Sequence, residues 1–135
     1  IALGENESTL YGFREIVERR AGDILQPSIT KVGGITEFRK IAALAQAANL
    51  PIAPHSFYFG PGLAATLHMA ATWGGPVPVE FPTGEHETSF LANPITARDG
   101  CVEVPSGPGL GIEINEEAIR KHPYTAAGAK PFVLH

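Results

Sequence analysis

The chain has 135 residues, and its 10 Lys and Arg against 14 Asp and Glu give a net charge of −4. Nucleic-acid-binding domains generally carry a basic face, so this composition argues against nucleic acid as a partner. The sequence has no stretch of about 18 apolar residues and no charged-then-apolar leader, so we expect neither a membrane span nor a signal peptide. The single Cys101 cannot form an internal disulfide, which favours a cytoplasmic location.

Four short apolar runs, at residues 1–4, 24–27, 52–54 and 77–79, are each followed by a polar residue. These polar residues are Glu5, Ser28, His55 and Glu80, at successive intervals of 23, 27 and 25 residues. A (β/α)₈ barrel takes roughly 30 residues for each strand and helix, and its chemistry lies at the C-terminal ends of the strands. The spacing therefore predicts consecutive barrel strands that contribute half of an active site.

Helical patterns separate these runs. The first extends from an N-cap at Ser8 to about residue 21, with Gly22 suited to the C-cap position. The second covers residues 35–48 and is closed by Asn49, and the third runs from Pro61 to a stop at residues 74–75. The order β, α, β, α, β, α, β predicts an α/β fold with parallel strands covered by helices.

The pattern changes after Glu80, where Pro and Gly become frequent. We expect an extension that carries one strand, Cys101 to Val104, and a short helix near residues 116–121. The Gly-rich segment 107–111 lacks a following Lys-Ser/Thr, so turns are a better interpretation than a phosphate-binding loop. Residues 85–87, Glu-His-Glu, could hold a metal but are interpreted as a solvated loop.

The first residues of the chain look like the end of a buried strand, with no Met before Ile1. A strand that ends there needs neighbours that the sequence does not supply. We therefore expect the C-terminal part of a longer protein, and a small independent α/β domain is the alternative.

Several ordered motifs, spread over nearly the whole chain, resemble the C-terminal third of the enolase superfamily. The match is to the mandelate racemase and muconate lactonizing enzyme branch, especially its acid-sugar enzymes. The motifs are Gly4-Glu5-Asn6, Gln26-Pro27-Ser28-Ile29-Thr30-Lys31-Val32-Gly33-Gly34-Ile35-Thr36, Pro54-His55-Ser56, Val79-Glu80, Ala92-Asn93-Pro94-Ile95 and Gly107-Pro108-Gly109-Leu110-Gly111.

This resemblance implies the C-terminal part of a (β/α)₇β barrel. Residues 1–81 would supply the fifth to eighth strands, and residues 82–135 an extension that packs on the barrel and on a capping domain. The capping domain, a second-strand lysine base and two further metal ligands would belong to an N-terminal portion of the same protein. The family also implies a homo-oligomer.

The resemblance also implies roles for the first and third strand-end residues. Glu5 would be a carboxylate ligand of Mg²⁺, a hard cation that prefers oxygen ligands. His55 would take or return the proton α to the substrate carboxylate, for which an imidazole is suited near neutral pH. Without the motifs, a solvated Glu5 and a structural hydrogen-bonded His55 would be the simpler interpretations.

Ser28 departs from the family pattern. Racemases of this type carry Asp at this position and muconate lactonizing enzymes carry Lys, whereas Ser28 has no charge. Ser28 is therefore expected to bind substrate and not to act as a second base. Lys31, three residues further on, is interpreted as a structural or surface residue. The resemblance makes Glu80 a second catalytic residue, which would hydrogen-bond the substrate carboxylate as it becomes an enediolate; a structural ion pair is the alternative.

The chemistry implied is Mg²⁺-dependent removal of a proton α to the carboxylate of a sugar acid or its lactone, through an enediolate. Because Ser28 cannot serve as a charged base, we expect an acid-sugar dehydratase or cycloisomerase that uses His55. A racemase or epimerase of a 2-hydroxy acid, a non-catalytic sugar-acid-binding homologue and a plain structural domain are the alternatives.

Overall fold

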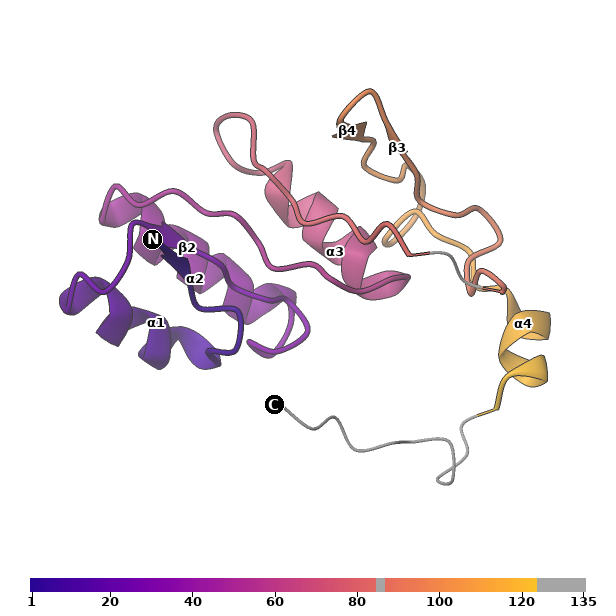
Figure 1. Cartoon of the computed structure of the whole chain (residues 1–135), viewed down its shortest axis with the longest axis horizontal. Helices are drawn as coiled ribbons and strands as arrows, with labels where there is room; N and C mark the ends of the chain where they lie inside the picture. Colours follow the sequence, from indigo (N-terminus) through magenta and orange to yellow (C-terminus); the bar gives the residue numbers. More distant parts are fainter. Residues whose placement is uncertain (85–86, 124–135) are drawn as a thin grey trace.

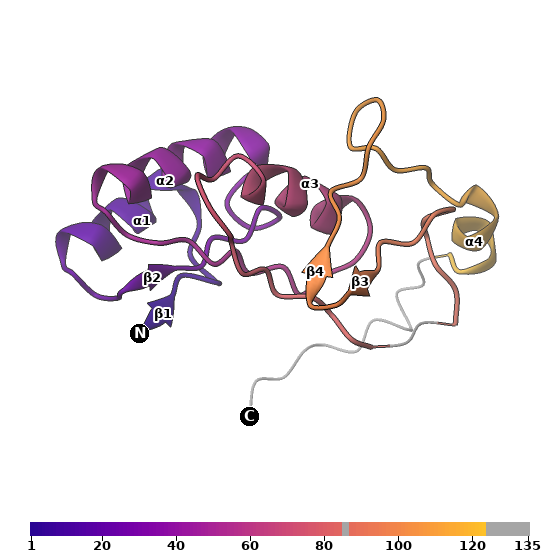
Figure 2. The same cartoon turned by 90° about the horizontal axis from the view of Figure 1, so that it is seen from above.

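The computed structural model describes residues 1–84 and 87–123. Helices α1 and α2 pack together beside a short sheet of β1 and β2, α3 lies in the middle of the molecule, and β3, β4 and α4 form the opposite end (Figures 1 and 2). The elements are β1 (Ala2–Leu3), α1 (Thr9–Glu18), β2 (Ile24–Leu25), α2 (Ile35–Ala47), α3 (Pro61–Ala70), β3 (Ala97–Arg98), β4 (Cys101–Val102) and α4 (Glu116–Lys121).

The first three apolar runs are joined as parallel strands, as the alternating pattern predicts. Strands β1 and β2 pair in parallel with Ala2 opposite Ile24. The third run joins them through a single parallel bridge between Leu25 and Ile52. A helix follows each of these runs, so the order strand, helix, strand is confirmed for this part of the chain.

The fourth run, residues 77–79, does not form the predicted strand in the described part of the chain. A strand needs a ladder of backbone hydrogen bonds to a neighbour, and the link between the third and fourth runs is made by a side chain instead. The hydroxyl of Ser56 donates to the carbonyl of Glu80 at 2.5 Å.

The first helix is shorter than the sequence suggests, because α1 ends at Glu18 and not near residue 21. Arg20 takes the left-handed backbone conformation, with φ of 51°, so the prediction of Gly22 as the C-cap was wrong. Gly22 has a different use, since a Cβ at this position would lie 2.7 Å from Cδ2 of Leu3. The glycine lets the chain leave the helix directly against β1.

The other two long helices begin where they were expected. Helix α2 starts after Gly34, whose φ of 97° favours glycine, and α3 starts with Pro61 at its first position. Asn49, which was expected to close the second helix, lies just beyond it in the left-handed region with φ of 55°. Helix α3 ends at Ala70, before the predicted stop at residues 74–75.

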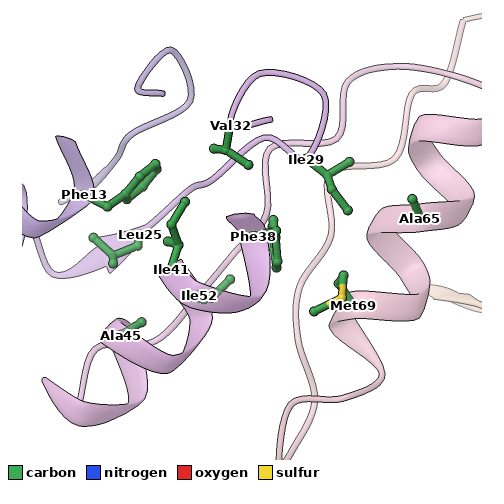
Figure 3. Packing of buried hydrophobic residues seen from close by; sticks show 10 residues of the cluster. All are labelled: Phe13, Leu25, Ile29, Val32, Phe38, Ile41, Ala45, Ile52, Ala65 and Met69. Atoms are coloured by element: carbon green, nitrogen blue, oxygen red, sulfur yellow. The ribbon is translucent and has the colours of Figure 1, made fainter. Parts of the chain in front are cut away.

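The core lies between α1, α2, the parallel strands and one side of α3 (Figure 3). Phe13, Leu25 and Ile41 are fully buried, and Ala65 and Met69 extend the cluster onto α3. All ten cluster residues come from the first 69 positions: Phe13, Leu25, Ile29, Val32, Phe38, Ile41, Ala45, Ile52, Ala65 and Met69.

The extension after Glu80 is held by short pairings. Strands β3 and β4 form an antiparallel hairpin, and the expected strand 101–104 ends at Val102. Leu91 bridges Ile114, and α4 covers residues 116–121 as predicted. The Nε2 atom of His68 on α3 lies 3.1 Å from the carbonyl oxygen of Leu110, and this contact joins the extension to the rest. Among the described residues, no helix is both long and apolar enough to cross a membrane.

Candidate active site

Three of the four strand-end residues meet at one place. The Nδ1 atom of His55 lies 2.6 Å from Oε2 of Glu80 and 3.7 Å from Oε2 of Glu5. The imidazole is sheltered, with 15% of its side chain exposed, whereas the two carboxylates are 55% and 45% exposed for Glu5 and Glu80. The imidazole, a group that can gain or lose a proton, therefore lies beside two solvent-accessible carboxylates.

Ser56 fixes the contact between the histidine and Glu80. Its backbone N–H donates to Oε2 of Glu80 at 3.3 Å, and its hydroxyl donates to the Glu80 carbonyl at 2.5 Å. Ser56 is fully buried, so the serine end of these bonds is shielded from solvent, whereas the Glu80 side chain is 45% exposed. The sequence shows this residue only as the neighbour of the histidine, and its hydrogen-bonding role was not predicted.

The end of the first strand depends on a glycine. Gly4 has φ of 110°, and a Cβ there would lie 2.7 Å from Cε1 of Phe13. The lack of a side chain lets the backbone rest against this core ring, and Glu5 follows immediately. The strand end that carries Glu5 is therefore placed by the core itself.

Glu5 is also linked, through Asn6, to the ammonium group of Lys31, which the sequence alone indicates as a structural or surface residue. Asn6 donates from Nδ2 to Oε1 of Glu5 at 3.3 Å, and Nζ of Lys31 donates to Oδ1 of Asn6 at 2.8 Å. Lys31 is exposed, as expected. The hydrogen bond from Lys31 to Asn6 therefore links the loop after the second run to the end of the first strand.

Ser28 does not join the other three residues. Its side chain is fully buried, and its hydroxyl is 3.1 Å from Oγ1 of Thr30. Its carbonyl accepts the N–H groups of Lys31 and Val32, each at 2.9 Å. Ser28 thus organises the turn after β2, and its predicted contact with substrate stays a prediction.

A tyrosine that the sequence did not single out borders the histidine. The rings of His55 and Tyr58 are in an edge-to-face arrangement, with centroids 6.4 Å apart and an interplanar angle of 87°. The aromatic stretch after His55 was visible in the sequence, but its pattern gives no indication of which ring faces the imidazole.

The described residues contain no group of three His, Cys, Asp or Glu side chains that could hold a metal ion by themselves. Glu5 still fits a hard cation, because its carboxylate is more than half exposed at a strand end. Glu85 and His86, from the loop interpreted as solvated, lie outside the described residues.

Comparison with known proteins gives consistent matches. Residues 1–118 match the family described as enolase C-terminal domain-like. The chain is 39% identical over 130 residues to the D-galactarolactone cycloisomerase of Agrobacterium fabrum, covering 88% of this chain and 34% of that enzyme. It is 32% identical over 126 residues to the D-xylonate dehydratase of Haloferax volcanii, covering 90% of this chain and 30% of that enzyme.

Among solved structures, the chain is similar to the 3,6-anhydro-D-galactonate cycloisomerase of Zobellia galactanivorans. The TM-score is 0.82 at 32% identity, over 90% of this chain and 35% of that one. The chain thus spans about a third of the length of the relatives it matches. Because the family match covers most of its residues, the chain belongs to the enolase C-terminal domain-like family of the enolase superfamily.

Proposed function

We propose that the protein removes the proton α to the carboxylate of a sugar acid, or of its lactone, and forms an enediolate. Loss of a β-hydroxyl from this intermediate gives dehydration, and rearrangement of a ring gives cycloisomerisation. The observation that carries the proposal is the meeting of His55, Glu80 and Glu5, the residues that follow the first, third and fourth apolar runs. The relatives named as a cycloisomerase and a dehydratase of sugar acids support it.

We assign the proton transfer to Nε2 of His55. Its Nδ1 faces Oε2 of Glu80 at 2.6 Å, so a proton on Nδ1 is held by this carboxylate. The other ring nitrogen is then an acceptor, because a neutral imidazole carries one proton. In dehydration, the α-proton moves to Nε2, the electron pair of the C–H bond enters the enediolate, and the imidazolium returns a proton to the departing hydroxyl.

Glu80 has two oxygens with different surroundings. Oε2 receives the contacts from His55 and from the Ser56 N–H. The described residues give Oε1 no hydrogen-bond partner, so we assign this atom to the substrate carboxylate, to which it would donate when it carries a proton, because an ionised carboxylate only accepts hydrogen bonds. Glu80 would thereby orient both the base and the group from which the proton leaves.

Glu5 is the residue of this chain that would hold Mg²⁺. When bound, the cation would stabilise the negative charge of the enediolate, as in other enolase-superfamily sites. We propose that the chain supplies the fifth to eighth strands of a (β/α)₇β barrel, with residues 82–135 as the extension. The second-strand lysine, the further metal ligands and the capping domain would come from the rest of the protein.

Ser28 favours one-sided chemistry over racemisation. A racemase needs a proton donor or acceptor on each face of the substrate, and a serine hydroxyl bonded to Thr30 is a poor substitute for a charged base. We still propose Ser28 as a substrate-binding residue. Its hydroxyl would replace the hydrogen bond to Thr30 with one to a hydroxyl of the sugar acid.

The direct test is to incubate the full-length protein with Mg²⁺ and a library of sugar acids in D₂O, following α-proton exchange and product formation. We expect exchange with at least one acid, and a loss of about 100-fold or more in His55→Asn, the scale of general acid-base catalysis. His122→Asn is the matched control, because His122 is exposed at the end of α4.

Two outcomes would contradict the proposal. One is the absence of both exchange and turnover with every acid in the library. The other is a His55→Asn variant as active as the wild type. Binding of an acid without exchange would favour the non-catalytic homologue.

A further inference from the structure

The segment that carries His55 is anchored on both sides. Before the turn, Ser56 bonds to Glu80, and within the turn the N–H of Tyr58 donates to the Ser56 carbonyl at 2.6 Å. After the turn, the hydroxyl of Tyr58 lies 2.8 Å from Oγ1 of Thr66 on α3. The imidazole therefore sits on a short segment whose far end is attached to a helix.

The direction of the Tyr58 hydrogen bond follows from the protons available. Thr66 is fully buried, and its hydroxyl donates to the carbonyl of Gly62 at 3.0 Å. A threonine hydroxyl has one proton, so its oxygen can only accept from Tyr58. The phenol is therefore the donor to an acceptor that the helix holds in place.

The Tyr58 ring is also confined by its other neighbours. A Cβ at Gly62 would lie 2.9 Å from Cδ2 of Tyr58 and 2.9 Å from Cγ2 of Thr30. The glycine thus allows the Tyr58 ring and the Thr30 methyl group to lie against the first turn of α3. The ring, packed against the core, has little room to move away from His55.

We propose that Tyr58 is a positioning residue for His55, and that Thr66 fixes Tyr58 in turn. The edge-to-face contact limits the orientation of the imidazole, and the hydrogen bond to Thr66 limits the orientation of the phenol ring. Glu80 holds Nδ1 of the imidazole, and Tyr58 restricts the tilt of the ring plane, which decides where Nε2 points. This inference rests on the proposed function of His55.

The test compares kinetics of full-length variants on a sugar acid that the wild type converts. Tyr58→Phe keeps the ring and removes its anchor, and Thr66→Val removes the acceptor. We expect kcat to fall roughly tenfold in both, because a small misplacement of a catalytic group is costly. KM should change by less than about twofold, since substrate binding is preserved. Thr66→Ser keeps the acceptor and should restore kcat close to the wild-type value.

Matched controls separate positioning from general loss of structure. Tyr11→Phe changes an exposed tyrosine on α1, and Thr72→Val removes a hydroxyl that donates to the Met69 carbonyl beyond the end of α3. Both should retain the wild-type kcat. Thermal unfolding of every variant should show that the folded state persists at the assay temperature.

The outcomes distinguish this inference from the function on which it rests. Wild-type kcat in Tyr58→Phe and Thr66→Val, together with an inactive His55→Asn, overturns the positioning role and leaves the proposed function standing. A His55→Asn variant that keeps full activity overturns both. A Thr66→Ser variant as impaired as Thr66→Val also overturns the role of the hydrogen bond.

Discussion

The part of the chain before Glu80 and the part after it are ordered by different interactions. The first contains the whole core cluster, from Phe13 to Met69. Among the described residues, the second buries only Pro82, Leu91 and Ala118, and it relies on two-residue strands and one bridge. Because apolar burial is the main favourable contribution to folding, the first part has an internal source of stability that the second lacks.

The site residues follow this division. Glu5 and His55 extend from the packed part, where the neighbouring strands and helices share a core. The extension, by contrast, meets α3 around a hollow of about 440 Å³, lined by apolar residues such as Phe59, Leu63 and Phe90. Proton transfer needs fixed distances, so under the proposed function it is the densely packed part that would hold His55 in place, and the hollow beside the extension would be available for substrate.

The largest effect that tests this comparison is expected from Phe38→Ala. Phe38 is 2% exposed at the centre of the first region, so removing its ring should cost about 3–5 kcal/mol in the free energy of unfolding. Urea unfolding of the full-length protein is the measurement. Leu91→Ala, a smaller truncation in the extension, should cost only about 2 kcal/mol, the low end of the range for Leu→Ala. A loss of about 5 kcal/mol in Leu91→Ala, the high end of that range, would show that the extension is packed as well as the first region.

A smaller effect, confined to the extension, is expected from Asn115→Ala. The Asn115 side chain accepts the N–H of Ala118 at 3.1 Å and caps α4. Its removal should destabilise this helix by about 1 kcal/mol. Amide hydrogen exchange should become faster in α4 and stay unchanged in α2, and Asn115→Ser should preserve the cap. Faster exchange in both helices would contradict the separation of the two regions.

The smallest effect is expected within the first region, from Glu37→Gln. Hydrogen bonds from the Lys40 ammonium and from the Leu10 N–H lower the pKa of Glu37 below its ordinary value of 4.5. A carboxyl whose pKa is lowered by folding stabilises the folded state above that ordinary value and loses this contribution as the pH falls through the folded-state pKa. The wild type should therefore have the higher Tm at pH 7.

Thermal unfolding from pH 7 to pH 3 measures this difference. The Tm values of the wild type and Glu37→Gln should converge as the solution is acidified below 4.5. Glu117→Gln is the control, because its pair with Lys121 on α4 is exposed and should contribute little. A Tm difference independent of pH would contradict the ionic origin of the effect.

The sequence predicts the fold best where a pattern depends on local chemistry. The apolar run at 24–27 and the helical pattern at 35–48 each indicate buried residues, and they contain β2 and α2 as expected. The run at 77–79 failed as a strand because strand formation depends on a neighbouring backbone. The C-cap prediction failed because a close approach to Leu3, and not a left-handed turn, requires Gly22.

The candidate site could be predicted to a similar degree. The strand-end rule brings Glu5, His55 and Glu80 together, and the structure has them in contact. Ser28 occupies an equivalent position in the pattern, yet its short side chain is hydrogen-bonded to Thr30 and does not extend to the other three residues. Tyr58 could not be found this way, because ring orientation is set by packing and not by spacing.

The serine hydroxyl that joins the third and fourth runs makes the position of Glu80 depend on one residue. In a paired sheet, a ladder of backbone hydrogen bonds would hold the two runs together whatever their side chains. Here the Ser56 hydroxyl binds the Glu80 carbonyl, and the Ser56 N–H binds the Glu80 carboxylate. A substitution at Ser56 can therefore shift the carboxylate relative to the imidazole while the core cluster, which does not include Ser56, stays intact.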